Sequence, residues 1–171
     1  MGKRSEKKMG RPEGTNKVRS LLPQKRRRSR EIALQVLYSI DIRENISPEL
    51  AIELYPFESE DDEVREYSGR LVKGVSENLN EIDALVRKNI TGWRPERMVI
   101  VDRVAIRLAL YESVVSEMIP VPVAISEAVE LAKRFGTAES GKFVNGVLGK
   151  IVRALGYDDS GERPHAGDHN C

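Results

Sequence analysis

Apolar residues recur at helical spacing through most of this chain, and this periodicity limits the folds open to it. Between residues 27 and 43 the apolar positions follow the i, i+3, i+4, i+7 pattern of one helix face. They are Ile32, Ala33, Val36, Leu37 and Ile40. Regular polar and apolar alternation over strand-length windows is scarce in the sequence. The pattern therefore predicts an all-α fold.

Turn and capping signals divide the rest of the chain into further helices. Ser47 and Pro48 open a short helix to about residue 54, and Pro56 ends it. A periodic segment after Glu60–Glu63 ends at about residue 79, and Asn80 caps another helix that runs through Arg87. A further helix is predicted from Pro95 to about residue 116, and two more at about 123–135 and 139–154. Six or seven helices with short links predict a packed helical domain.

Charge is distributed very unevenly along the sequence. Residues 1–30 contain twelve Lys or Arg and two Glu, a net charge of +10, whereas the remainder contains 16 Lys or Arg and 25 Asp or Glu, a net charge of −9. A basic arm on an acidic body is typical of proteins that bind a polyanion, although a solvated tail without a target is the alternative. Residues 1–24, which lack apolar periodicity, are expected to be disordered, and residues 156–171 to form a flexible polar tail.

The arginine-rich stretch Arg26–Arg30 differs from the rest of the basic arm because it leads directly into the first predicted helix. A rigid element fixes the positions of its side chains. The stretch is therefore predicted to be a positioned contact with a polyanion, whereas residues 1–24 are expected to add only unspecific attraction.

Residues 136–142 match G-x-x-x-x-G-K, the start of a nucleotide-binding loop. Phe143 follows where the motif requires Ser or Thr, and a predicted helix precedes the loop where the motif requires a strand. We interpret the segment as a helix end followed by a helix start, whose amides near residues 139–141 could hold a phosphate beside Lys142.

Catalytic and metal-ligating residues form no recognisable set in the sequence. Both histidines and the single cysteine, Cys171, lie in the C-terminal tail. We therefore predict no catalytic site, no metal and no cofactor. Neither a membrane span nor a secretory signal is evident, and a chain without an internal disulfide suits the cytoplasm.

Two blocks of sequence carry a resemblance to a known family. The first runs from Arg26 to Ser39, and the second from Arg107 to Leu148, ending in Lys-Phe-Val-Asn-Gly-Val-Leu. Both resemble the bacterial NusB family of transcription antitermination proteins, and the likeness covers about residues 25–155. The resemblance implies two small packed helical bundles, with subdomains of about residues 25–78 and 79–155.

The same resemblance implies a partner set and candidate site residues. The expected partners are boxA RNA of nascent ribosomal RNA transcripts, the ribosomal protein NusE as a heterodimer, other Nus factors, the RNA polymerase elongation complex, and a second copy of the chain as a homodimer. The expected RNA-binding residues are Arg26, Arg27, Arg28, Arg30, Gln35, Glu139, Lys142 and Phe143. The expected partner-binding residues are Tyr38, Asp102 and Arg107. A second hypothesis is an interaction module whose basic arm is only an electrostatic tether to RNA.

Overall fold

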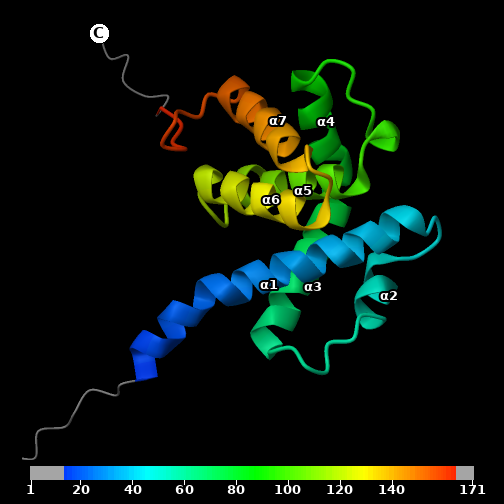
Figure 1. Cartoon of the computed structure of the whole chain (residues 1–171), viewed down its shortest axis with the longest axis vertical. Helices are drawn as coiled ribbons and strands as arrows, with labels where there is room; N and C mark the ends of the chain where they lie inside the picture. The colour runs from blue at the N-terminus through cyan, green and yellow to red at the C-terminus, as the bar shows by residue number, and fades with distance from the viewer. Residues whose placement is uncertain (1–13, 165–171) are drawn as a thin grey trace, which may run out of the picture.

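The computed structural model describes residues 14–164, with side chains from Leu22 onward. Over these residues it contains seven α-helices and no strand (Figure 1). The helices are α1 (Gly14–Ile42), α2 (Pro48–Glu53), α3 (Asp62–Glu77), α4 (Leu79–Asn89), α5 (Ile100–Leu110), α6 (Val121–Phe135) and α7 (Ser140–Ala154). The predicted all-α class is confirmed.

The helices form two groups that share one core. Helices α1, α2 and α3 pack together, and α4, α5, α6 and α7 pack together beside them (Figure 1). The apolar stripes of the helices meet in one continuous cluster of buried side chains, which includes Leu71, Ile82, Ile106 and Ile151 at 0% exposure. Helix α1 contacts both α3 and α5, so it joins the two bundles.

Helix α1 begins earlier than predicted. Residues 14–24 are helical although we expected disorder there, and Pro23 lies inside the helix. A proline removes one backbone hydrogen bond and can kink a helix without ending it, so α1 continues through Pro23. The first part of the predicted disordered segment, residues 1–13, lies outside the described residues.

The single helix predicted for residues 95–116 is divided into three parts. A 3-10 turn covers Pro95–Arg97, α5 follows an extended Val99, and a π-helical turn covers Tyr111–Val115. The Ser116 amide donates to the Tyr111 carbonyl at 2.9 Å, which closes the π turn. Pro95 opens the short 3-10 turn instead of α5, which starts only at Ile100, after the non-helical Met98 and Val99. Similarly, α4 begins at Leu79, before the predicted Asn80 cap.

The chain after α7 is more ordered than predicted. The Asp158 carboxylate accepts hydrogen bonds from the Ser160 amide at 2.9 Å and the Glu162 amide at 3.0 Å. The Arg163 guanidinium lies 4.6 Å from the centroid of the Tyr157 ring. Residues 156–164 thus form a hydrogen-bonded turn, because an Asp side chain can close a turn on its own backbone. Residues 165–171 lie outside the described residues.

Candidate nucleic-acid interface

The arginine-rich stretch lies in the middle of α1, where successive side chains point in different directions. Arg26 and Arg27 are exposed, Arg28 is half-buried and Arg30 is buried. Each residue of an α-helix is turned by about 100° from the one before it. The four arginines therefore face both solvent and the protein interior, and they do not form one surface.

Arg30 lies in the protein interior, and its contact with RNA stays a prediction. Its side chain is 5% exposed, and its Nε atom lies 2.8 Å and 3.1 Å from the two carboxylate oxygens of Glu112 in the π-helical turn. The hydroxyl of Tyr67 on α3 donates to the same carboxylate at 2.5 Å. Burial disfavours the charged guanidinium, but the hydrogen bond and the charge of Glu112 raise the pKa of Arg30 overall. Arg30 thus links α1, α3 and the π turn.

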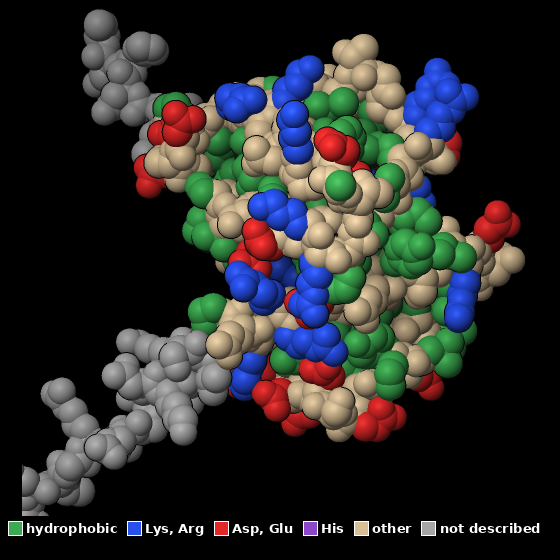
Figure 2. Space-filling model, in the orientation of Figure 1, with side chains coloured by type: hydrophobic (Ala, Val, Ile, Leu, Met, Phe, Trp, Pro, Cys, Tyr) green, Lys and Arg blue, Asp and Glu red, His purple; other side chains and the backbone are tan. Residues whose placement is uncertain are grey.

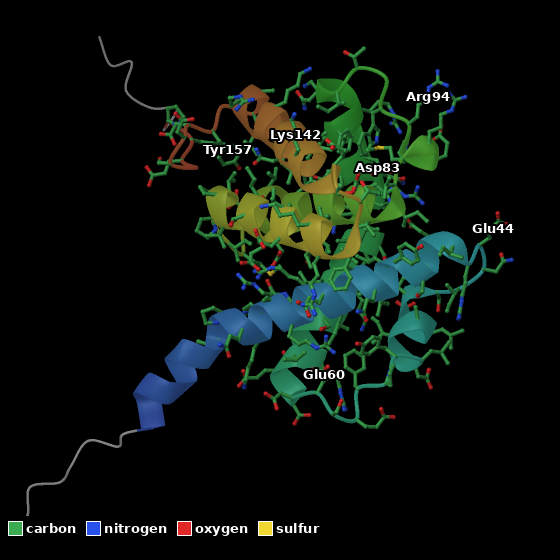
Figure 3. The ribbon with its side chains drawn as sticks, in the orientation of Figure 1. Glu44, Glu60, Asp83, Arg94, Lys142 and Tyr157 are labelled. Atoms are coloured by element: carbon green, nitrogen blue, oxygen red, sulfur yellow. The ribbon has the colours of Figure 1, made fainter. Side chains whose placement is uncertain are left out.

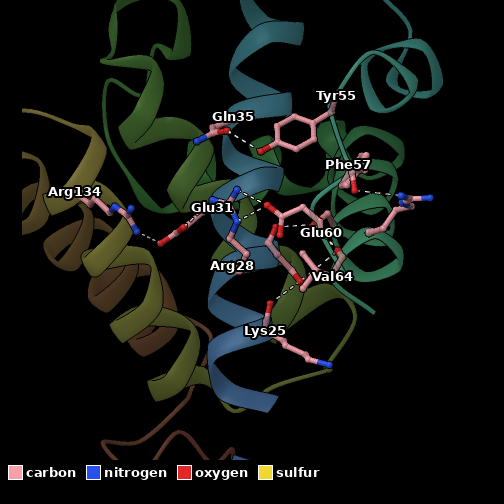
Figure 4. Close-up of polar contacts among 12 residues, drawn as sticks. Lys25, Arg28, Glu31, Gln35, Tyr55, Phe57, Glu60, Val64 and Arg134 are labelled. Carbon is pink, nitrogen blue, oxygen red and sulfur yellow. Dashed lines mark hydrogen bonds and ion pairs between the residues drawn. The ribbon is translucent and has the colours of Figure 1, made fainter. Parts of the chain in front are cut away.

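Arg26 and Arg28 both turn toward the bundle of α1, α2 and α3. The Arg26 guanidinium lies 3.7 Å from the centroid of the Tyr67 ring, a cation–π arrangement. Arg28 pairs with Glu60, which precedes α3, and with Glu31 one turn along α1 (Figure 4). The hydrogen bond to Glu60 is the main cause that raises the pKa of Arg28.

Arg27 turns toward α6. Its Nη2 and Nε atoms donate to the two carboxylate oxygens of Glu127 at 2.9 Å and 3.2 Å. In the next turn of α1, Glu31 accepts from Arg134 near the end of α6 (Figure 4). These pairs join the arginine stretch to the second bundle.

The second predicted RNA-binding region lies at the start of α7. Glu139, Lys142 and Phe143 are exposed, and they line a shallow depression together with Ile90, Gly146, Val147 and Lys150. The Phe143 side chain is 41% exposed. An exposed aromatic ring between lysines is a surface on which a base can stack while phosphates bind the cations.

The nucleotide-binding motif at residues 136–142 is a connection between two helices, as predicted. The Thr137 amide donates to the Ser140 hydroxyl at 2.9 Å, and the Ser140 amide donates to the Thr137 carbonyl at 3.1 Å. The Ser140 side chain is fully buried. Of the amides predicted to hold a phosphate, that of Ser140 is therefore already used within the connection.

Exposed cations from three helices share one side of the molecule. Figure 2 shows Lys and Arg side chains in a column that crosses α1, α6 and α7, and Lys142 lies on this side (Figure 3). We define the basic face as Arg27 on α1, Lys133 and Arg134 on α6, and Lys142 and Lys150 on α7. The sequence prediction missed Lys133, Arg134 and Lys150. Lys133 and Arg134 lie in the last turn of α6, where basic residues are common, and Lys150 lines the depression beside Phe143. The sequence prediction considered mainly the more strongly charged N-terminal arm.

Acidic residues interrupt the basic face. Glu127 and Glu130 on α6 and Glu139 before α7 are its acidic members, and Glu130 pairs with Lys133 at 3.6 Å. Gln35 is exposed on α1, where its side-chain oxygen accepts from the Tyr55 hydroxyl at 3.3 Å. Its contact with RNA stays a prediction.

Of the three predicted partner-binding residues, only Tyr38 is exposed. Arg107 is 6% exposed, and its guanidinium holds Asp83 of α4 through two bonds of 2.9 Å (Asp83 is labelled in Figure 3) and Asp41 of α1 at 3.3 Å. Asp102 is 5% exposed. Arg107 and Asp102 lie on α5, which is enclosed by its neighbours, and their contact with a partner stays a prediction. Arg107 instead connects α1, α4 and α5.

Tyr67, which donates to Glu112, makes the stability of the fold depend on pH in the alkaline range. Burial is the main cause that raises the pKa of Tyr67 from 10.0 to about 12, and the charge of Glu112 contributes to the same direction. An unfolded chain releases this proton near pH 10, so the stability contributed by Tyr67 is present below about pH 10 and is lost as pH rises toward about 12. We expect the free energy of unfolding, measured by urea denaturation, to fall across this window.

The Tyr67→Phe variant separates this effect from other groups that titrate in the same range. It should show a smaller decrease in stability between pH 10 and pH 12 than the unchanged chain. Parallel curves for the two proteins would contradict the assignment.

Among residues 14–164 no group of three or more His, Cys, Asp or Glu side chains could hold a metal ion. The histidines and Cys171 of the tail lie outside these residues. Within the same part of the chain, no helix combines the length and apolar character that crossing a membrane requires.

Comparisons with known proteins agree with this architecture. Residues 27–153 match the model of the NusB family. A transcription antitermination protein NusB from Symbiobacterium thermophilum is 44% identical over 139 residues, which cover 76% of this chain and 90% of the relative. The NusB of Bacillus cereus is 46% identical over 131 residues, 77% of this chain and 99% of the relative.

Solved structures are similar over the same region. NusB of T. maritima superposes with a TM-score of 0.68 at 38% identity, covering 75% of this chain and 90% of its own. A crystal structure of the antitermination factors NusB and NusE in complex with dsRNA contains a chain that superposes with a TM-score of 0.67 at 30% identity. The match covers 77% of this chain and 98% of that chain.

Proposed function

Because the chain belongs to the NusB family of transcription antitermination factors, we propose that it binds boxA RNA of nascent ribosomal RNA transcripts together with NusE. In this role it helps RNA polymerase read through terminators. The family acts in transcription and is not a family of enzymes.

The observation that carries the proposal is the basic face. It presents exposed cations of three helices on one side, with the exposed Phe143 ring beside Lys142 and Lys150. Single-stranded nucleic acid is bound by this combination, because bases stack on aromatic rings while phosphates pair with Lys and Arg. The similar chain in the crystal structure of NusB and NusE with dsRNA supports RNA and NusE as the partners of this chain.

Replacing Lys142 with alanine tests the basic face. We expect RNA binding to weaken about three- to tenfold and the salt dependence of the binding constant to decrease by about 0.7, because one phosphate contact is lost. Fluorescence anisotropy with boxA RNA at several salt concentrations measures both. Lys73→Ala is the matched control, since Lys73 is an exposed lysine of α3, which contributes nothing to the basic face.

Equal weakening by the two substitutions would contradict the proposed surface. Scrambled RNA of the same composition, with and without NusE, separates this proposal from the tether hypothesis. Binding that distinguishes boxA from scrambled RNA only after NusE is added would favour the tether.

The exposed Tyr38 on α1 is the residue we propose for contact with a protein partner. NusE is the proposed partner at this position, and other Nus factors with RNA polymerase complete the proposed assembly in the cytoplasm. Self-association of the free chain stays a prediction. Sedimentation of the chain with and without NusE and RNA tests both kinds of assembly.

A further inference from the structure

Three arginines at the boundary between α1 and its neighbours share one arrangement: each covers a glutamate that is less exposed than itself. The Arg27 side chain is 58% exposed above Glu127 at 16%, Arg28 is 40% exposed above Glu60 at 13%, and Arg134 is 62% exposed above Glu31 at 8%. These cations face solvent, but each already has an anionic partner beneath it.

Arg27 and Glu127 form a two-point ion pair within the basic face. Each carboxylate oxygen of Glu127 accepts one bond from the guanidinium, at 2.9 Å and 3.2 Å. Arginine binds phosphate through the same two-point geometry. Glu127 therefore occupies the donor positions that Arg27 would offer to an RNA phosphate.

Glu127 also has a second partner that would remain if Arg27 left. Nη1 of Arg30 lies 3.5 Å from Glu127 Oε2, and Arg30 is fixed by its buried pair with Glu112. Removing Arg27 from Glu127 does not leave an isolated carboxylate in a half-buried position. The pair can therefore open at a modest cost, as expected for an ion pair whose arginine is exposed to solvent.

From these contacts we propose that Glu127 is an internal competitor of RNA for Arg27 and thereby limits the RNA affinity of the chain. This inference rests on the proposed function, since it requires that RNA bind the basic face. An RNA phosphate that approaches Arg27 replaces the Glu127 carboxylate, which then keeps Arg30 as its partner. Glu127 thus sets how strongly an RNA must bind elsewhere on the basic face before it engages Arg27.

The Glu127→Gln variant tests the proposal, with Glu130→Gln as its matched control. Both substitutions remove one negative charge from α6. Glu130, however, is 58% exposed in its side chain and holds Lys133 through one contact of 3.6 Å, so its removal frees no two-point donor for a phosphate. We expect Glu127→Gln to bind boxA RNA about two- to fivefold more tightly, as an exposed ion pair is worth at most about 1 kcal/mol. Glu130→Gln should change the affinity clearly less. Fluorescence anisotropy and a thermal unfolding curve for each full-length variant provide the readouts.

A double-mutant cycle with Arg27→Ala identifies the route of the effect. If Glu127 acts by occupying Arg27, the gain from Glu127→Gln should disappear when Arg27 is alanine. Three results would overturn the proposal: equal gains from Glu127→Gln and Glu130→Gln, a gain that persists without Arg27, or weaker binding by Glu127→Gln, which would make Glu127 a positioning residue.

The unchanged chain separates the two levels of inference. If it binds neither boxA nor scrambled RNA, with or without NusE, then the proposed function fails, and the role of Glu127 with it. If it binds RNA and Glu127→Gln leaves the affinity unchanged, only the role of Glu127 is overturned.

Discussion

Replacing Arg30 with alanine is expected to lower the free energy of unfolding by about 3–5 kcal/mol, because it leaves the buried Glu112 carboxylate without its cation. Both side chains of this pair are nearly inaccessible, at 5% and 2% exposure. Tyr67 still donates to Glu112, but one neutral hydroxyl cannot replace a guanidinium that bonds both carboxylate oxygens. Urea denaturation followed by circular dichroism measures the change.

Arg27→Ala is the control on the same helix. Arg27 is exposed and its pair with Glu127 faces solvent, so its removal should change the free energy of unfolding by no more than about 1 kcal/mol. Similar losses for the two variants would contradict the structural role of Arg30. A variant that removes both charges, Arg30→Met with Glu112→Leu, should recover part of the loss, since no unpaired charge stays buried.

This expectation affects how RNA-binding data on the arginine stretch are interpreted. A chain that carries Arg30→Ala can lose RNA affinity because part of it is unfolded. Variants of Arg27 and Lys142 report on contact with RNA more directly, because both side chains are exposed.

Replacing Gly74 with alanine is expected to destabilise the fold toward the upper end of about 1–3 kcal/mol, because the added methyl group has no space. A Cβ atom at this position of α3 would lie 1.9 Å from Cζ and 2.2 Å from the hydroxyl oxygen of Tyr111. Tyr111 is buried at the start of the π-helical turn, so its ring cannot move aside into solvent. Thermal unfolding measures the expected decrease in stability.

Gly69→Ala on the same helix is the matched control with the opposite expected sign. No atom lies within 4 Å of a Cβ built at Gly69. Alanine there restricts the unfolded chain and favours the helix, which should stabilise the protein by about 0.4–1 kcal/mol. If Gly74→Ala also stabilised the protein, the close packing of α3 against the π turn would be contradicted.

The sequence predicted the helical class and most helix positions, because the apolar stripes of α1, α3, α6 and α7 are local patterns. It did not predict the buried pair of Arg30 and Glu112, because a run of arginines was interpreted by composition rather than by its position on the helix. Arg30 precedes Ala33, Leu34 and Leu37 by three, four and seven residues, which are all buried. Arg30 therefore shares a helix face with these three buried residues, and this spacing could have identified it as an interior residue.

Other errors could not have been avoided from local patterns. The partners of Arg30 and Arg107 lie 82 and 24 residues away in the sequence, and only the packing of helices brings them together. The contacts of the π-helical turn are also distant in sequence. Its Glu112 accepts hydrogen bonds from Arg30 on α1 and Tyr67 on α3. Acidic and basic residues in a sequence do not reveal which of them pair, and this pairing determines which arginines remain available to RNA.

The order in which the ribosome makes the chain gives the pair of Arg30 and Glu112 a further consequence. Arg30 is synthesised 82 residues before Glu112, and Arg27 is synthesised 100 residues before Glu127. At about 5–20 residues per second, these intervals last from about 4 to 20 seconds. During that time the emerging arginine helix lacks the glutamates of the second bundle that later neutralise it. Arg27 and Arg30 of the nascent chain are therefore without their own carboxylate partners until the second bundle has been translated.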